Sequence, residues 1–176
     1  MERETVVRTA LELLNEVGVE GLTTRRLADK LGVKQPALYW HFKNKQELLN
    51  EMALVMIEEP MRAVSRPLPG QPWDEWLMAR ARVFRQTLRS YRDGARVHAG
   101  SRPTPDRLPD LVELMRPLLE AGFERQDAIR AFIAVGRFVV GSAIDELDHA
   151  VWEDPDGDFE FGLRALVSGM RSILEA

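Results

Sequence analysis

The sequence has no cysteine in its 176 residues, which excludes disulfides, thiolate catalysis and cysteine zinc sites together. No apolar run approaches the roughly 20 residues of a membrane span, and the charged, amphipathic N-terminus is unlike a secretory signal. We therefore expect a soluble, cytoplasmic protein. Glycine-rich phosphate loops, G-x-S-x-G elbows and H-E-x-x-H pairs are also absent, so the sequence predicts a protein that is not an enzyme.

Period-two alternation of apolar and polar residues is scarce too, so helix is the only regular element predicted. We expect an all-α protein with three parts: a helix-turn-helix domain over 1–46, a connecting helix over 47–64, and a helical ligand-binding and dimerisation domain over 65–176. The segment Ser65–Pro72 marks the second boundary, because it holds three prolines and a glycine in eight residues.

The stretch from Thr23 to Lys45 predicts two short helices around a glycine turn. Thr23 can cap a helix over Thr24–Leu31, Gly32 permits a tight turn, and Pro36 suits the first turn of a second helix ending near His41. This pattern is typical of a helix-turn-helix DNA reader, which completes a three-helix head with an amphipathic helix over Thr5–Val17. An ordinary helical hairpin with a solvated basic face is the alternative.

The outward residues of the second helix carry the chemistry of base recognition. Gln35 can present a bidentate amide to adenine, Arg25 can reach a guanine edge, and Pro36 and Ala37 can touch thymine methyls. Tyr39, Lys43 and Lys45 suit phosphates.

Charge is segregated along the chain and favours the DNA reader. The net charge is −4, yet the segment from Gly21 to Gln46 carries +5 and the remainder −9. A basic patch of limited size on an acidic body predicts binding to DNA that is sensitive to salt but not promiscuous.

Further helices are expected downstream, with a loop over 100–109 and an acidic turn over Glu153–Asp158. The predicted helices span 48–63, 72–90, 95–98, 108–119, 127–151 and a terminal stretch from Phe159 to Leu174. The helix over 127–151 is apolar nearly all round, so it must be buried on several sides. A homodimer through the last two helices explains this, with Gly136 and Gly141 allowing close approach and Leu163, Leu166 and Met170 completing an intermolecular bundle. The alternative is the central core helix of a monomer.

The chain resembles the tetracycline-repressor (TetR) family over essentially its whole length. The motifs are ALELLNEVG, EGLTTRRLADKLGVKQPALYWHFKNK, YRDGARVHAGSRPT and AVGRF. The resemblance implies a homodimeric repressor that binds a palindromic operator and is released by a small-molecule inducer. It also implies that DNA is contacted by Thr24, Arg25, Lys34, Gln35, Pro36, Ala37, Tyr39, Trp40, His41 and Lys45, with Arg25 and Gln35 as base readers.

The resemblance to the family's drug site is selective. The family's namesake binds tetracycline as a magnesium chelate, and the positions that match the metal side and adjoining wall are Phe84, His98, Ser101, Arg102, Pro103 and Asp145. At the opposite end, the family's polar residues are replaced by Met61, Arg80, Leu114 and Arg137, and Met115 adds apolar wall. Because a site built to hydrogen-bond a ligand rejects a poor match, the resemblance predicts an inducer other than tetracycline.

Three expectations follow for the ligand and its action. No cofactor is obligatory, but magnesium carried by the inducer would have His98 as its protein ligand. Arg80 or Arg137, if buried without a carboxylate partner, would mark an anionic or polyphenolic inducer. A ligand near His98 and Arg102 would shift the short helix ending there, push on the connecting helix and change the separation of the two heads.

Two rival functions stay open on the sequence alone. One is a small helical enzyme built on His98, Asp145 and Arg102, although no activated nucleophile accompanies them. The other is a DNA-binding scaffold whose body binds a protein partner and whose pocket is filled by side chains.

Overall fold

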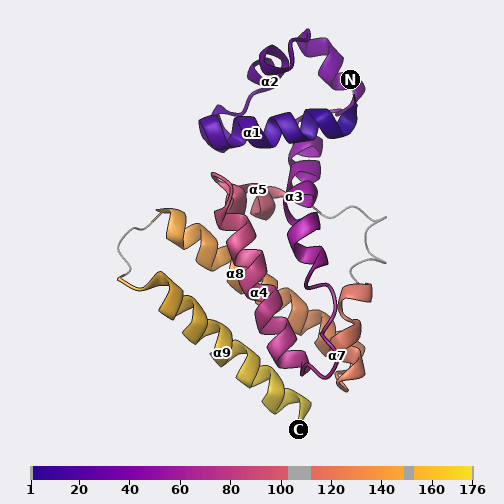
Figure 1. The fold of residues 1–176 in the computed structure, drawn as a ribbon, viewed down its shortest axis with the longest axis vertical. Helices are drawn as coiled ribbons and strands as arrows, with labels where there is room; N and C mark the ends of the chain where they lie inside the picture. Colours follow the sequence, from indigo (N-terminus) through magenta and orange to yellow (C-terminus); the bar gives the residue numbers. More distant parts are fainter. Residues whose placement is uncertain (1, 103–111, 149–152, 176) are drawn as a thin grey trace. The chain divides into compact units, whose positions relative to one another are not determined.

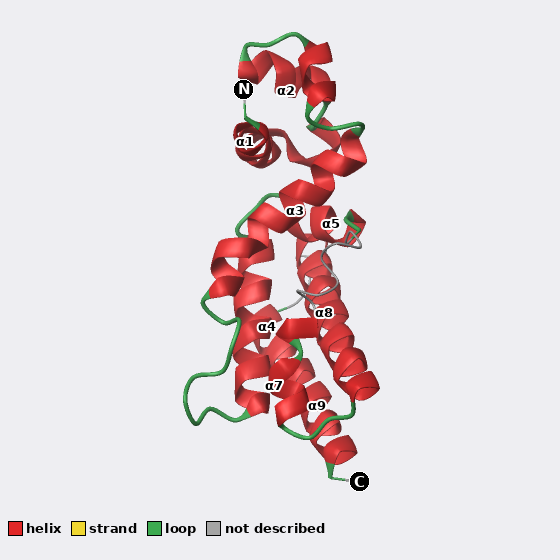
Figure 2. Cartoon of the chain, turned by 90° about the vertical axis from the view of Figure 1, so that its right-hand side faces the viewer, coloured by secondary structure: helices red, strands yellow, loops and turns green. Residues whose placement is uncertain are grey.

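The computed structural model describes residues 2–102, 112–148 and 153–175. Every regular element in these ranges is a helix, which confirms the all-α prediction (Figure 2). In chain order they are α1 (Arg3–Gly21), α2 (Thr24–Leu31), the 3-10 helix η1 (Gln35–Trp40), α3 (Lys45–Arg62), α4 (Trp73–Arg89), α5 (Gly94–Gly100), α7 (Arg116–Glu120), α8 (Arg125–Asp148) and α9 (Pro155–Leu174). Within these residues, no helix is long and apolar enough to cross a membrane.

The chain forms two compact units, and neither is continuous in sequence. The first comprises Met1–Glu59 and Gln86–Arg102, and the second comprises Pro60–Arg85 and Pro103–Ala176. Residues 86–102, which are predicted from the sequence to lie in the ligand-binding domain, therefore pack with the N-terminal unit. The domain boundaries at 46 and 64 stay a prediction.

The first unit is built around a small apolar core shared by α1, α2, η1 and α3 (Figure 1). Val6 and Leu14 of α1, Leu27 of α2 and Met52 of α3 are almost completely buried. The predicted start of α2 is confirmed, because the Thr23 hydroxyl accepts a hydrogen bond from the Arg26 amide at 3.2 Å. The turn after α2 is made by Gly32, whose φ of 67° lies in the left-handed region that glycine adopts freely.

The start of α3 departs slightly from the prediction. The Asn44 side chain accepts a hydrogen bond from the Glu47 amide at 2.9 Å, as expected for an N-cap. In a capping box, the side chain three residues after the N-cap accepts a hydrogen bond from the backbone amide of the N-cap residue. Here the Glu47 carboxylate accepts instead from the backbone amide of Lys43, one residue before the N-cap, at 2.8 Å. Because Asn44 is the N-cap, the helix begins at Lys45 rather than at Leu48.

Two helices of the second unit, α8 and α9, run side by side in opposite directions (Figure 1). Two arginines tie α4 to them. Arg82 forms two hydrogen bonds of 2.7 Å with Glu160 of α9. Arg85 is bound to Glu146 of α8 at 2.8 Å and to Asp156 of α9 at 2.7 Å.

The structure corrects the prediction of a turn through Asp158, because α9 already begins at Pro155. Asp154 accepts a hydrogen bond from the Gly157 amide at 2.9 Å and caps the helix. Proline in the first turn costs no hydrogen bond, and acidic residues there are stabilised by the helix dipole. The signals interpreted as a turn are those of a helix start.

Two of the three residues of α9 that are predicted to be intermolecular need correction, while Leu166 is half-buried and stays a prediction. Leu163 is completely buried and Met170 is 5% exposed within the single chain, so these side chains belong to its own core. The outward face of α9 instead presents Phe161 and Ile173. On α8, Ala128, Val135 and Val139 are buried while Ile133 and Leu147 are exposed, so one chain covers only part of its apolar surface.

The region before α7 is described only in part. The helix predicted over 108–119 contains residues 108–111, which lie outside the described residues, as does the predicted loop residue Pro103. From residue 112 on, the chain is helical but is interrupted at Met115, before α7. Residues 149–151, the predicted end of α8, also lie outside the described residues.

Candidate DNA-reading surface and inducer-binding residues

The two helices of the predicted reader are joined by a hydrogen bond between two predicted DNA-contacting residues. The side-chain amide of Gln35 donates to the Thr24 hydroxyl at 2.9 Å, and both residues are half-buried. The second helix is a 3-10 helix rather than the α-helix that a reader usually presents. Its single buried side chain, Leu38, anchors it to the core. Gln35 is thereby held in one orientation before any ligand arrives.

The other predicted DNA contacts surround this pair. Tyr39 is 52% exposed and Trp40 is 88% exposed, which is unusual for side chains of this size. Arg25, Lys34, Pro36 and Lys45 are exposed, and Ala37 and His41 are half-buried. A large exposed aromatic beside cationic side chains is typical of a surface that binds a partner.

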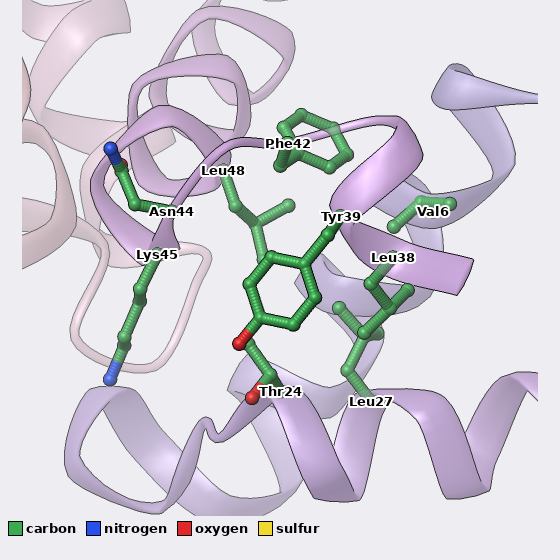
Figure 3. A pocket seen from close by; sticks show the side chains of 9 residues that line it. All are labelled: Val6, Thr24, Leu27, Leu38, Tyr39, Phe42, Asn44, Lys45 and Leu48. Carbon is green, nitrogen blue, oxygen red and sulfur yellow. The ribbon is translucent and has the colours of Figure 1, made fainter. Parts of the chain in front are cut away.

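A small hollow under η1 belongs to the packing of the head. Its volume of about 10 Å³ has room for no more than one water molecule. Figure 3 shows Tyr39 lying over it with its hydroxyl directed toward Thr24. The lining residues are Val6, Thr24, Leu27, Leu38, Tyr39, Phe42, Asn44, Lys45 and Leu48. It is too small to bind an inducer.

One basic residue of the head is neutralised locally. Lys30 lies 2.6 Å from the carboxylate of Glu16 and 3.8 Å from that of Glu12, both on α1. The hydrogen bond to Glu16 raises the pKa of Lys30. The cationic surface of the reader therefore depends on the other basic residues of the segment, Arg25, Arg26, Lys34, Lys43 and Lys45.

The end of α5, where the resemblance places part of the inducer site, is bonded to α3. Gln46 donates through its side-chain amide to the carbonyl of Gly100 at 2.8 Å. The Asn50 side-chain oxygen accepts from the backbone amide of Arg102 at 3.0 Å and from the side-chain amide of Gln46 at 2.9 Å. Gln46 and Asn50 were not predicted as functional residues, because their partners lie more than 50 residues away and nothing local in the sequence signals the pairing.

The beginning of α5 is bonded to α1 in the same unit. Asp93 accepts a hydrogen bond from the Val19 amide at 2.9 Å. Arg92 donates through its backbone amide to Asn15 at 2.9 Å and through its side chain to the Glu16 carbonyl at 2.8 Å. Both ends of α5 are therefore bonded to other helices of the first unit, the start to α1 and the end to α3.

Within α5, His98 is half-buried, and burial lowers its pKa. The imidazole is therefore neutral at neutral pH and can offer a nitrogen lone pair. Ser101 donates its hydroxyl to the His98 carbonyl at 2.7 Å, and the Arg102 side chain is exposed.

The predicted inducer-binding residues of the second unit fall into three groups. Met61, Arg80 and Met115 are buried. Phe84 and Leu114 are half-buried, and Arg137 and Asp145 are exposed. The expectation that a buried arginine marks an anionic or polyphenolic inducer therefore applies to Arg80 and not to Arg137.

Asp145 lines a cavity of about 190 Å³ between α8 and the start of α9. Ser142, Glu146, Pro155, Asp158 and Phe159 complete the lining. In the described part of the chain, no group of three or more histidine, aspartate or glutamate side chains could hold a metal ion. Magnesium takes most of its ligands from water and from the bound molecule, so the single imidazole of His98 would be enough as a protein ligand.

A helix-turn-helix head with an exposed basic reading face, joined to a helical ligand-binding region, defines a DNA-binding transcriptional regulator. Residues 6–52 match the model for bacterial regulatory proteins of the tetR family, and residues 66–153 match the model for the tetracyclin repressor-like C-terminal domain. The chain is a member of the TetR family of transcriptional repressors.

Individual relatives agree with this assignment. The chain is 42% identical to the class A tetracycline repressor from transposon 1721 of Escherichia coli, over 97% of this chain and 90% of that protein. A variant of the TetR protein of Acinetobacter baumannii AYE, solved with minocycline, is 42% identical with a TM-score of 0.90, covering 100% of this chain and 99% of that one. Class A TetR, solved with 5a,6-anhydrotetracycline and magnesium, is 43% identical with a TM-score of 0.84, covering 98% and 99%.

Proposed function

We propose that this protein is a cytoplasmic homodimeric repressor that binds a palindromic operator and is released from it by a small-molecule inducer other than tetracycline. Arg25 and Gln35 read bases, while the remaining predicted contacts, from Thr24 to Lys45, touch thymine methyls or the DNA backbone. The observation that carries the proposal is the set of hydrogen bonds joining the end of α5 to α3.

These bonds provide a physical route from ligand to DNA. α3 begins five residues after η1, so a displacement of α3 moves the reader. Because Gln46 and Asn50 hold Gly100 and Arg102 to α3, an inducer that displaces the end of α5 pulls on α3 through fixed contacts. The inducer needs only to favour one arrangement of the dimer over the other by a few kcal/mol, typically about 1–3.

The inducer is proposed to contact the residues that the resemblance implies. They are Met61, Arg80, Phe84, His98, Ser101, Arg102, Leu114, Met115, Arg137 and Asp145, together with Pro103, which lies outside the described residues. The anhydrotetracycline complex of class A TetR contains magnesium, which supports a magnesium ion carried by the inducer, with the neutral imidazole of His98 as its protein ligand. The four departures at Met61, Arg80, Leu114 and Arg137 support an inducer of different chemistry.

The α5–α3 bonds can be tested by uncoupling them. We expect Asn50→Ala, alone or with Gln46→Ala, to keep operator affinity and ligand affinity while losing most of the release that an inducer causes. Fluorescence anisotropy of a labelled operator, titrated with inducer, measures release, and calorimetry measures ligand binding. Gln126→Ala, an exposed glutamine at the start of α8, is the control and should release normally. Full release from the Asn50→Ala variant would contradict this route.

A further inference from the structure

Arg80 is a buried cation on α4 that has no carboxylate partner among the described residues. Only 8% of the residue is exposed. Arg85, one and a half turns further along the same helix, is exposed to the same extent but is bound by Glu146 and Asp156. Arg82, between them, is bound by Glu160. α4 thus allows an internal comparison between Arg82 and Arg85, which are paired with carboxylates, and Arg80, which has no acidic partner among the described residues.

Among the described residues, the Arg80 guanidinium makes one hydrogen bond. One guanidinium nitrogen donates to the Val64 carbonyl at 3.2 Å. The same carbonyl accepts from the indole nitrogen of Trp76 at 3.1 Å, so both of its lone pairs are occupied. The guanidinium also lies over the ring of Phe132, 5.4 Å from its centroid. A guanidinium has five N–H donors, and a carbonyl and a ring do not neutralise its charge.

Burial without a counter-charge is unfavourable for this group. Desolvation lowers the pKa of Arg80 to about 10, so the side chain remains charged at neutral pH. An isolated buried charge is normally paired, and the planar fork of arginine matches a carboxylate through two parallel hydrogen bonds. The half-buried ring of Phe132 beside it matches the apolar part of a ligand rather than a hydrated ion.

We infer that Arg80 binds the carboxylate of the inducer, and that the inducer is an organic acid with an apolar, aromatic or long aliphatic body. This inference rests on the proposed function, because it assigns the chemical class of ligand for the same site. An acid is favoured because it supplies the one charge that the described residues around Arg80 do not.

The test compares acids with their uncharged amides. Benzoate, 1-naphthoate, 2-naphthoate and decanoate, each beside its amide, are titrated into the full-length protein while its Tm is followed. Ligand binding raises Tm by mass action, so we expect at least one acid to raise it by several degrees while its amide does not. Arg80→Met should lower affinity for that acid at least about tenfold, as for loss of a charged hydrogen bond. Arg82→Gln, the control, should keep it.

A second measurement does not depend on finding the right acid. Without ligand, Arg80→Met should leave Tm unchanged or higher, because it removes a buried charge that has no counter-charge among the described residues. Arg85→Met should lower Tm, because it breaks a buried pair. The inference is overturned if Arg80→Met destabilises as much as Arg85→Met, if no acid protects, if amides protect equally, or if Arg80→Met keeps the response.

Operator binding separates this inference from the proposed function. If the wild-type protein binds operator and is released by an uncharged compound, the proposed repressor function stands, and the inference that the inducer is an organic acid is wrong. If it binds no operator, the repressor proposal itself fails, whatever the acids do.

Discussion

At the scale of single residues, the orientation of Gln35 by Thr24 is the feature that distinguishes base reading from general attraction to DNA. The 2.9 Å bond uses one amide hydrogen and leaves the second hydrogen and the carbonyl oxygen of Gln35 available for an adenine edge. Thr24 thereby restricts the rotamers of Gln35 before binding, which lowers the entropy lost on contact with a base.

We expect Gln35→Ala and Arg25→Ala each to weaken operator binding by about 1–3 kcal/mol, roughly 5–150-fold, because each removes a contact to a base edge. Binding to a scrambled duplex should change little. Anisotropy titrations with both duplexes measure the two affinities. Lys34→Ala is the control, since a phosphate contact should weaken both affinities together and reduce the salt slope by about one. Equal losses on both duplexes for Gln35→Ala would show that it does not read bases.

His98 gives a prediction about pH. Burial lowers its pKa in the folded state, so between that value and the unfolded value of about 6.5 the unfolded chain binds more protons. The contribution of His98 to the free energy of unfolding is therefore fully present above pH 6.5 and is lost as the pH falls through the folded-state pKa of His98. His98→Asn lacks this contribution. We expect the Tm of the wild-type protein to fall more steeply between pH 7.5 and 5.5 than that of His98→Asn, and parallel curves would contradict it.

Residue chemistry could be predicted where the signal is local. The cap at Thr23 and the turn at Gly32 follow from side chains and backbone within a few residues, so the structure agrees with the sequence there. The difference between Arg80 and Arg137, one buried and one exposed, depends on the packing of distant helices. Both arginines are predicted from the sequence as possible anion contacts, and no local signal distinguishes them.

At the scale of elements, α5 is short but is fixed at both ends, and its first residue tolerates no side chain. A Cβ added at Gly94 would lie 2.4 Å from the carbonyl oxygen of Leu88, which is backbone and cannot rotate away. A Cβ added at Gly100, at the other end of α5, would meet nothing within 4 Å. The two glycines form a matched pair.

We expect Gly94→Ala to lower the free energy of unfolding by about 1–3 kcal/mol, the usual cost of overpacking. Gly100→Ala should have little effect or stabilise slightly, because alanine is the better helix former. Urea unfolding of the two variants and the wild-type protein measures the difference. Similar stability of the two variants would mean that the turn before α5 relaxes to make room.

Element boundaries show the same division between local and distant causes. α2 matches its predicted bounds because both of its ends are set by their own residues. The start of α9 was misplaced because aspartate, proline and glycine also occur in turns, and the sequence does not say which use applies. The hydrogen bonds from Gln46 and Asn50 to the end of α5 join segments far apart in the chain, so no reading of a single helix could find them.

At the scale of the whole molecule, the unmatched apolar surface of α8 and α9 supports assembly into a dimer. Phe161 and Ile173 are 70% and 61% exposed on α9, and Ile133 and Leu147 are more than 40% exposed on α8. Ala165 and Gly169 lie between the two exposed residues of α9, and a Cβ added at Gly169 would meet nothing within 4 Å. Small residues flanked by large apolar ones let a second helix approach closely, and a two-fold axis would bring the same surface of the partner against it.

This surface can be tested against an equally exposed apolar residue elsewhere. Phe161 and Leu68 are each 70% exposed, but Leu68 lies in the proline-rich segment rather than on α9. We expect Phe161→Arg to shift the protein from dimer to monomer in sedimentation velocity, because a two-fold interface would bury two introduced charges. Leu68→Arg should remain dimeric.

The consequence for DNA follows from the number of readers. One short helix contacts few bases, so binding to a palindrome depends on two heads held about one helical turn of DNA apart. The Phe161→Arg monomer should therefore lose most of its affinity for the palindrome while binding a single half-site as weakly as the wild-type protein does. If the monomer kept full affinity for the palindrome, each head would be acting independently, and an inducer could not release the protein by changing their separation.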